Sequence, residues 1–190
     1  MSSHHIVREN QEPALLIADA DAFPFTWIEQ LLEWSPTVIV LESALEAVLS
    51  WGIKLDMVIS APDQVDAHMK LLRDQVPVKI LSHHTQDHSI NTAMMFLTAE
   101  KYKAVNVVGS APGLVEDFAD RMDIVTFFEG KRWVYIRNGK FEKWVSRGTL
   151  FEFPESVKSI EGLDKNGLAV KDGVIKAEAD FPFWVGEVLQ

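Results

Sequence analysis

Four acidic residues in the first two thirds of this chain each follow a short apolar run. They are Glu42, Asp63, Asp87 and Glu116. The runs have the length and β-branched content of buried strands, and parallel strands place their carboxyl ends along one edge of a sheet. Carboxylates at such an edge are suitable ligands for Mg²⁺, which commonly bridges protein acids to nucleotide phosphates. The spacing therefore predicts a phosphoryl-transfer site in which these acids converge on magnesium and a nucleotide.

Simpler roles are open for some of the same residues. Asp63 and Asp87 each precede a helical run, where an aspartate can cap free backbone amides. A histidine-rich loop follows the fourth apolar run and contains His83, His84, Asp87 and His88. Imidazoles suit a transition metal, but these lack a matched partner cluster. The alternative is a solvated loop in which His84 or His88 lines a pocket.

The elements that would position these residues alternate between two periods. Short apolar runs span residues 14–18, 37–41, 57–59, 78–81, 104–108 and 124–127. Between them apolar side chains recur at helical spacing, as in Leu45 and Val48 or Ile90 and Met94. Parallel strands need crossover connections, so this order predicts an α/β fold with a Rossmann-like parallel sheet flanked by helices.

The last third of the chain has a different pattern. Short alternating segments span residues 133–136, 141–145, 149–153, 168–170 and 174–176, with Asn138-Gly139 and Asp172-Gly173 as hairpin signals. We therefore expect a small antiparallel β-sandwich after the parallel sheet. The predicted division is a nucleotide-binding domain over residues 1–128 and a β-sandwich domain over residues 129–190, packed together.

Composition limits the partners of the chain. Its 190 residues contain no cysteine, which excludes a disulfide framework and a thiolate metal site. The formal net charge of −10 opposes general binding to nucleic acid, which usually needs a basic surface. No apolar run approaches membrane length. We expect no nucleic-acid partner, no membrane association and a cytoplasmic location.

A basic and aromatic segment after residue 130 offers the opposing interpretation. Its basic residues are Lys131, Arg132, Arg137, Lys140, Lys143 and Arg147, interleaved with tryptophan and tyrosine. Such interleaving is found in proteins that bind single-stranded nucleic acid. Alternation instead predicts that these side chains occupy the exposed face of a hairpin whose other face is core.

The ordered series of strand-end segments resembles the thiamine pyrophosphokinase family. The family pattern is Ala-Asp-Gly-Gly, then Gly-Ile-x-Pro-Asp-x-x-x-Gly-Asp-x-Asp-Ser, then Asp-x-Thr-Asp, then Gly-Gly-Arg-x-Asp-His. The corresponding segments are residues 41–44, 52–64, 87–90 and 112–117. Residues 157–163 are similar to the family's strand that leads into a Gly-Leu pair.

This resemblance implies a Rossmann-like domain followed by a β-sandwich, in a homodimer whose thiamine sites involve both subunits. It also implies that diphosphate passes from ATP, with Mg²⁺, to a hydroxyl of thiamine or a related small molecule. By the same resemblance Asp63 and Asp87 are catalytic and metal-binding. The implied nucleotide-binding residues are Glu42, Ser43, Ser89 and Glu116.

The departures from the pattern fall at chemical positions. Ala61 and Ile90 replace carboxylates, and Leu114 replaces an arginine, whose guanidinium offers phosphate a bidentate fork. The family's Ser-Asn near the carboxyl terminus has no counterpart at residues 181–185. Two hypotheses follow: a diverged diphosphokinase with weakened or lost activity, or a non-catalytic ligand-binding or assembly protein on the same scaffold.

Overall fold

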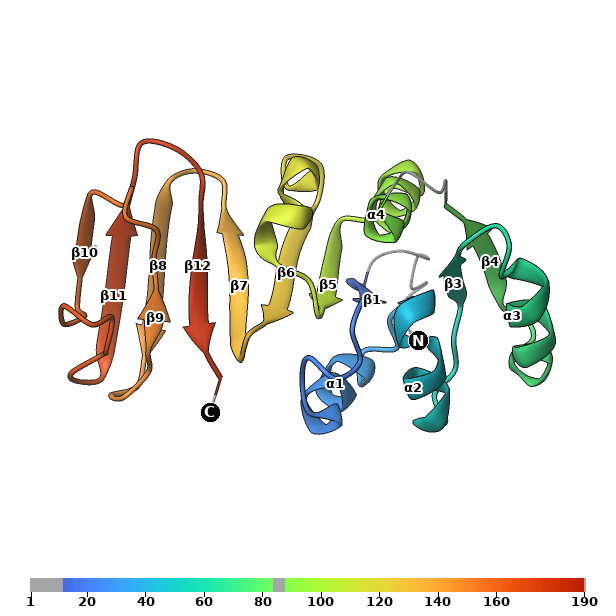
Figure 1. Ribbon diagram of the computed structural model, residues 1–190. Coiled ribbons are helices and arrows are strands. Elements are labelled where there is room, and N and C mark those ends of the chain that lie inside the picture. The colour runs from blue at the N-terminus through green and yellow to red at the C-terminus, as the bar shows by residue number, and fades with distance from the viewer. Residues whose placement is uncertain (1–11, 84–87, 190) are drawn as a thin grey trace, which may run out of the picture.

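The computed structural model describes residues 12–83 and 88–189, and its first part alternates strands and helices (Figure 1). The elements are β1 (Ala14–Ile17), α1 (Phe25–Leu32), β2 (Val38–Leu41), α2 (Leu45–Ser50), β3 (Met57–Ser60), α3 (Val65–Leu71), β4 (Lys79–Ser82), α4 (Ser89–Ala99), β5 (Ala104–Val108) and β6 (Asp123–Phe128). Short 3₁₀ turns add η1 (Glu42–Ala44), η2 (Arg73–Gln75), η3 (Pro112–Leu114) and η4 (Glu116–Phe118). Every predicted strand of this part is present.

These strands form a parallel array in the order β4-β3-β2-β1-β5-β6. Crossovers between parallel strands are right-handed. The steps from β1 to β4 and the later steps from β4 to β6 run in opposite directions, so their connections cover opposite faces. Side chains of α1 and α2 accordingly pack on one face, and those of α4 and η4 pack on the other. The predicted Rossmann-like sheet is confirmed.

The central strand is buried on both faces. All four residues of β1 are inaccessible to solvent. Leu16 packs with Ile39 and with Met94 of α4, while Leu15 packs with Val40 on the other face. A continuous apolar run is what a strand covered on both sides requires, which explains why the sequence shows no alternation there.

The carboxyl-terminal part is antiparallel. It comprises β7 (Lys131–Ile136), β8 (Lys140–Val145), β9 (Phe151–Glu152), β10 (Ser159–Glu161), β11 (Gly173–Glu178) and β12 (Phe183–Val188). Strands β7, β12 and β9 extend the parallel array into a nine-stranded sheet, and β10, β11 and β8 form a separate small sheet. Phe151, Ile175, Ala177 and Val185 belong to the core shared by the two sheets, so the predicted sandwich is confirmed.

Two details of this part differ from the sequence prediction. Strand β12 was not predicted, β10 lies within residues 157–163, where the resemblance alone implied a strand, and residues 168–170 make isolated bridges through Leu168 and Ala169 instead of a strand. The hydrogen-bonded ladder also continues from β6 to β7 across the predicted division after residue 128. The antiparallel strands are therefore joined edge to edge with the parallel sheet.

Five of the six basic side chains of the segment after residue 130 form ion pairs with acids. The ion pairs are Lys131–Glu152, Arg132–Glu187, Arg137–Asp123, Lys140–Glu178 and Lys143–Glu187. Lys143 corrects the predicted alternation, because it lies on the inner face of β8 with Phe141 and Val145 and binds Glu187 across the sandwich at 2.6 Å. Most of the positive charge of this segment is therefore balanced by neighbouring carboxylates.

Within the described ranges, no helix combines the length and apolar character needed to cross a bilayer.

Candidate functional site

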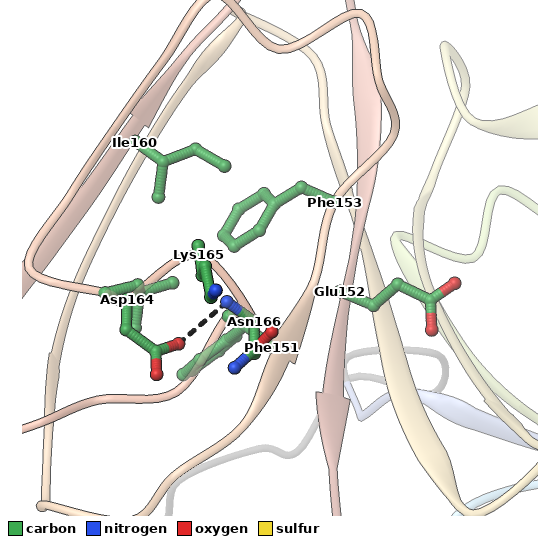
Figure 2. Close-up of a pocket in the computed structure, with 9 residues that line it drawn as sticks. Phe151, Glu152, Phe153, Ile160, Asp164, Lys165 and Asn166 are labelled. Carbon is green, nitrogen blue, oxygen red and sulfur yellow. Dashed lines mark hydrogen bonds between the residues drawn. The ribbon is translucent and has the colours of Figure 1, made fainter.

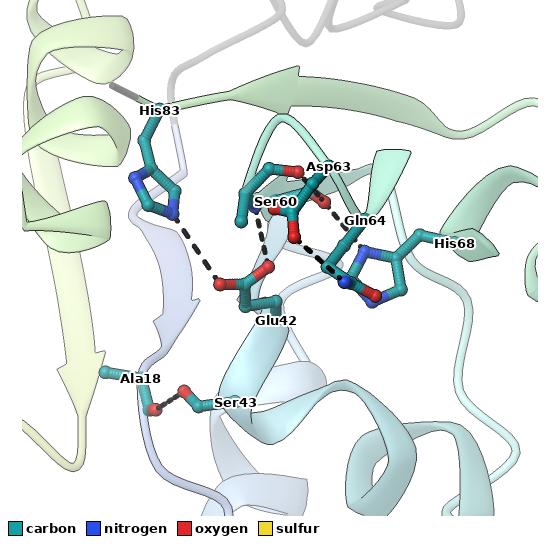
Figure 3. Close-up of polar contacts among 9 residues, drawn as sticks. Ala18, Glu42, Ser43, Ser60, Asp63, Gln64, His68 and His83 are labelled. Atoms are coloured by element: carbon teal, nitrogen blue, oxygen red, sulfur yellow. Dashed lines mark hydrogen bonds and ion pairs between the residues drawn. The ribbon is translucent and has the colours of Figure 1, made fainter. Parts of the chain in front are cut away.

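One carboxylate connects three strand ends at the carboxyl edge of the parallel sheet (Figure 3). Glu42 follows β2 directly, and its Oε2 accepts a hydrogen bond from the backbone N–H of Ala61, just after β3, at 2.6 Å. Its Oε1 lies 3.6 Å from Nε2 of His83, which follows β4. The predicted edge position of Glu42 is therefore observed, and its carboxylate ties the ends of β2, β3 and β4 together.

Two further polar contacts consolidate the same edge (Figure 3). The Ser43 hydroxyl donates to the carbonyl of Ala18 at 3.1 Å, which joins the end of β2 to the end of β1. Ser60 is fully buried, and its Oγ lies 2.8 Å from Nδ1 of His68 on α3. The Ser60–His68 contact could not be read from the sequence, because no spacing rule joins a strand end to a histidine eight residues later.

Asp63 lies in the turn between β3 and α3 and is exposed. Its Oδ2 accepts a hydrogen bond from the side chain of the adjacent Gln64 at 3.2 Å. The start of α3 has no side-chain cap, so the alternative of Asp63 as a helix cap is wrong. A surface carboxylate whose contact is with a mobile amide can reorient toward a ligand.

The third motif of the resemblance, residues 87–90, is only partly covered by the structure. Asp87 and His84 lie outside the described residues. Ser89 is the first residue of α4 and is half-buried, and His88 precedes it at an exposed position with no side-chain cap bond. Ser89 thus begins the helix that follows β4, seven residues after the end of that strand.

Glu116 is not at this edge. After η3 the connection that follows β5 packs over the sheet face at η4, and Glu116 Oε2 there accepts a hydrogen bond from Nε1 of Trp184 on β12 at 3.1 Å. Five strand spacings separate β2 from β12, or roughly 24 Å. The predicted convergence of Glu116 with Glu42 is therefore wrong, because a residue eight positions past its strand has left the edge.

The described acids give a limited fit to magnesium. In the described ranges no three histidine, aspartate or glutamate side chains lie close enough together to hold a metal ion. Glu42 already bonds a backbone amide, which leaves Asp63 as the edge carboxylate open to a ligand. Magnesium can be held by one or two protein carboxylates when phosphates and water complete its shell. The described residues therefore fit magnesium only if phosphates and water supply most of its ligands.

The strand-end segments are electronegative. Residues 18–24, 42–46, 60–66, 82–89 and 109–117 contain no lysine or arginine, and nine of their residues are acidic. Leu114, at the position of the family's arginine, is 51% exposed on η3. A nucleotide bound here would have its phosphate charge balanced by metal ions and by histidines rather than by guanidinium or ammonium groups.

The crevice where the strand order reverses, between β1 and β5, is closed by backbone. Gly109 follows β5 at φ +82°, and a Cβ there would lie 2.6 Å from the backbone nitrogen of Asp19. The amides of Ala18 and Asp19 both donate to the carbonyl of Val108. Ligands of doubly wound sheets usually bind at this switch point, and in this chain the Gly109–Asp19 contact fills it.

A cavity of about 480 Å³ opens at the edge of the sandwich (Figure 2). Phe153 and Ile160 face each other across it, whereas Glu152 points to the other side of β9. Asp164 fixes the rim, since its Oδ1 accepts the backbone N–H groups of Asn166 and Leu168 at 2.8 and 2.9 Å. The lining combines apolar side chains with the polar groups of Asp164, Lys165 and Asn166, so the cavity is suited to a small ligand that carries both kinds of group.

The Glu42 contacts give a stability prediction. Glu42→Ala should lower the free energy of unfolding by about 2 kcal/mol, since it leaves the Ala61 amide without its charged acceptor. Glu42→Gln keeps an acceptor oxygen and should cost under about 1 kcal/mol. Urea denaturation measures both, with Glu46→Ala, at an exposed position of α2, as the control. Equal losses for Glu42→Ala and Glu46→Ala would contradict the bridging role.

The architecture described above defines a class of protein: a parallel α/β sheet whose last strand continues into an antiparallel sandwich of the same chain. No protein-family model and no curated protein sequence matches the chain. Solved structures do match it.

Several of the matching structures are thiamine pyrophosphokinases. The enzyme from Candida albicans superposes with a TM-score of 0.68 at 9% identity, over 94% of this chain and 90% of its own. Yeast thiamin pyrophosphokinase gives 0.68 at 8% identity, over 95% and 87%. The Bacillus subtilis enzyme gives 0.62 at 7% identity, over 93% and 99%. The chain thus has the thiamine pyrophosphokinase fold across both of its parts.

Proposed function

We propose that this chain is a thiamine pyrophosphokinase-like protein that binds magnesium-ATP at the carboxyl edge and slowly transfers diphosphate to a hydroxyl of thiamine or a related small molecule. The observation that carries the proposal is the match to thiamine pyrophosphokinase structures over both parts of the chain, at 93–95% coverage. We place nucleotide binding in residues 1–128 and acceptor binding in residues 129–190.

The proposed roles follow the observed positions of the side chains, except that of Asp87, which rests on the sequence resemblance. Asp63 and Asp87 would hold the magnesium, which would neutralise charge on the phosphates. Ser43 and Ser89 would donate hydroxyl hydrogen bonds to the nucleotide, and Glu42 would hold the edge in shape through the Ala61 amide. The acceptor oxygen attacks the β-phosphorus, the bond to the α-phosphate oxygen breaks, and AMP leaves. Asp63 takes the hydroxyl proton.

Distance within one chain supports the proposed homodimer. The sandwich cavity borders β9, which is six strand spacings from β2, or roughly 29 Å. Transfer requires the reacting atoms to be about 3–3.5 Å apart. An acceptor in the sandwich therefore cannot reach a nucleotide beside Glu42 of the same chain. A second copy would have to bring its sandwich to that edge.

A second candidate function is ligand binding without catalysis. It is favoured by the lack of lysine and arginine in the strand-end segments and by Leu114 at the arginine position. Phosphoryl transfer depends mainly on positioning and on cations that stabilise developing charge. A scaffold that lacks those cations can keep the ability to bind a ligand more readily than it can keep catalytic activity.

Thermal unfolding with ligands tests the binding part of both proposals. ATP with Mg²⁺ should raise Tm in a concentration-dependent way, because a ligand that binds the folded state alone stabilises it. Asp63→Asn should remove the magnesium-dependent part of the shift, while Asp66→Asn, at an exposed position of α3, should not. Absence of any shift with ATP, AMP, thiamine and thiamine diphosphate would refute both functions.

A further inference from the structure

The sandwich cavity, with its volume of about 480 Å³, is lined by three charged side chains. Glu152 points to the other side of β9 and pairs with Lys131 (Figure 2). Asp164 and Lys165 are neighbours in the rim, but among the described residues no ion pair joins them to each other or to a third group. Two opposite charges that do not neutralise one another are therefore available to a ligand in this cavity.

The rim that carries these two charges is fixed by backbone hydrogen bonds. Asp164 Oδ1 accepts the N–H groups of Asn166 and Leu168, and Oδ2 has no hydrogen bond in the part of the chain that the structure describes. The rim also packs on β9, since the N–H of Phe151 donates to the carbonyl of Gly167 at 2.9 Å. A Cβ at Gly167 would clash with the Phe151 carbonyl oxygen, so glycine is required there. A rim fixed before binding loses little entropy when a ligand binds.

The opposite part of the cavity is apolar and is also well packed. The Phe153 ring lies against Phe141 and Phe151, with ring centroids 6.1 and 6.2 Å apart. Ile160 is in register with the buried Ala177, which places its side chain on the inner face of β10. It is nevertheless 44% exposed, because the cavity opens beside it. Phe153 and Ile160 face each other across the cavity (Figure 2), and a flat ring fits between them.

A ligand that complements this lining needs three groups. A ring matches the apolar wall, an anion matches Lys165, and a cation matches Asp164. Because the two rim charges belong to adjacent residues, the two charges of the ligand must also lie close together. A ligand with one charge alone would meet a like charge in the rim and leave the other rim charge unmatched. Free α-amino acids carry an ammonium and a carboxylate on the same carbon atom, and an aromatic side chain supplies the ring.

We propose that the sandwich cavity binds a free amino acid with an aromatic side chain. The ring lies between Phe153 and Ile160. The carboxylate accepts hydrogen bonds from the Lys165 ammonium and the Asn166 amide, and the ammonium donates to Oδ2 of Asp164. This binding does not depend on diphosphate transfer. The amino acid also excludes an acceptor from the same cavity, and that consequence alone rests on the proposed function.

NMR of the full chain with ¹³C-labelled isoleucine methyl groups tests the proposal, and Ile160→Val assigns the Ile160 signal. Free phenylalanine is the probe. Its matched controls are 3-phenylpropionate, which lacks the ammonium, and 2-phenylethylamine, which lacks the carboxylate. Phenylalanine should shift the Ile160 signal saturably, with a Kd in the millimolar range. Each control should bind at least about threefold more weakly, because one pairing with an exposed charge is lost.

Two charge variants assign the contacts. Lys165→Gln should weaken the binding of phenylalanine and phenylpropionate by about threefold or more, and it should not weaken the binding of phenylethylamine. Asp164→Asn keeps an acceptor oxygen for the backbone N–H groups, and it should weaken phenylalanine and phenylethylamine but not phenylpropionate. Lys171→Gln, at an exposed position outside the cavity, is the control. Equal Kd values for the three probes, no shift of the Ile160 signal, or an unchanged phenylalanine Kd in Lys165→Gln would overturn the proposal.

AMP release separates this inference from the proposed function. Saturating phenylalanine should raise the thiamine concentration that gives half-maximal AMP release, because both ligands need the cavity. Phenylalanine binding without any AMP release would support the cavity assignment and refute the transfer reaction. AMP release without phenylalanine binding would support the transfer reaction and overturn the cavity assignment.

Discussion

Gly109→Ala is expected to lower the free energy of unfolding by about 2–5 kcal/mol. At φ +82° a side chain adds about 1–2 kcal/mol of backbone strain. Its Cβ would also press on the backbone of Asp19, and overpacking adds about 1–3 kcal/mol. Neither Asp19 nor the β5 end can retreat, because the Ala18 and Asp19 amides are bonded to Val108.

Gly52→Ala supplies the matched control. Gly52 also has a positive φ, +68°, but a Cβ there meets nothing within 4 Å. It should cost only about 1–2 kcal/mol, from strain alone. Urea denaturation of both variants measures the difference. A Gly109→Ala loss no larger than that of Gly52→Ala would mean that the crevice between β1 and β5 is open, contrary to the structure.

Leu114→Arg is expected to increase the rate of AMP formation by roughly 10²-fold or more, since a cation at the phosphates contributes on that scale to phosphoryl transfer. Leu114 is exposed, so the substitution need not disturb the core. It would place one guanidinium on strand-end segments that have no lysine or arginine. The rate of AMP release with saturating ATP and thiamine measures the effect.

Met95→Arg is the control for this gain of charge. Met95 is exposed in the middle of α4. The substitution therefore changes the net charge by the same amount but places no cation in the strand-end segments. It should leave the rate unchanged. An equal rate for Leu114→Arg and the unsubstituted chain would show that the missing arginine does not limit this protein.

The parallel part of the fold was accessible from the sequence because its strands are buried on both faces. Runs such as residues 14–17 and 57–60 are almost wholly apolar. A strand that is covered on both faces needs apolar side chains at nearly every position, and such a run is easily recognised in a sequence. Strand β10 left no such pattern, since all three of its residues are exposed. Lys143 could not be placed either, because its inward position depends on Glu187, far away in sequence.

The sequence predicted the positions of candidate site residues only where they directly follow a strand. Glu42 directly follows β2, and it lies at the edge as expected. Its bond to the Ala61 amide is a tertiary contact that no local pattern reveals. Glu116 is carried away from the edge because Val115 and Phe118 pack on the sheet face, a tertiary contact that the motif alone does not show. The role of Asp87 stays a prediction.

The central claim is slow diphosphate transfer at the Glu42 edge, and AMP release is its most direct test. The full chain is incubated with ATP, Mg²⁺ and thiamine, and AMP and thiamine diphosphate are quantified together. We predict equal amounts of the two products, a kcat below about 1 s⁻¹, which is the low end for enzymes, and loss of both products in Asp63→Asn. No AMP with thiamine or a pterin alcohol, at enzyme concentrations close to that of the substrate, would contradict the claim.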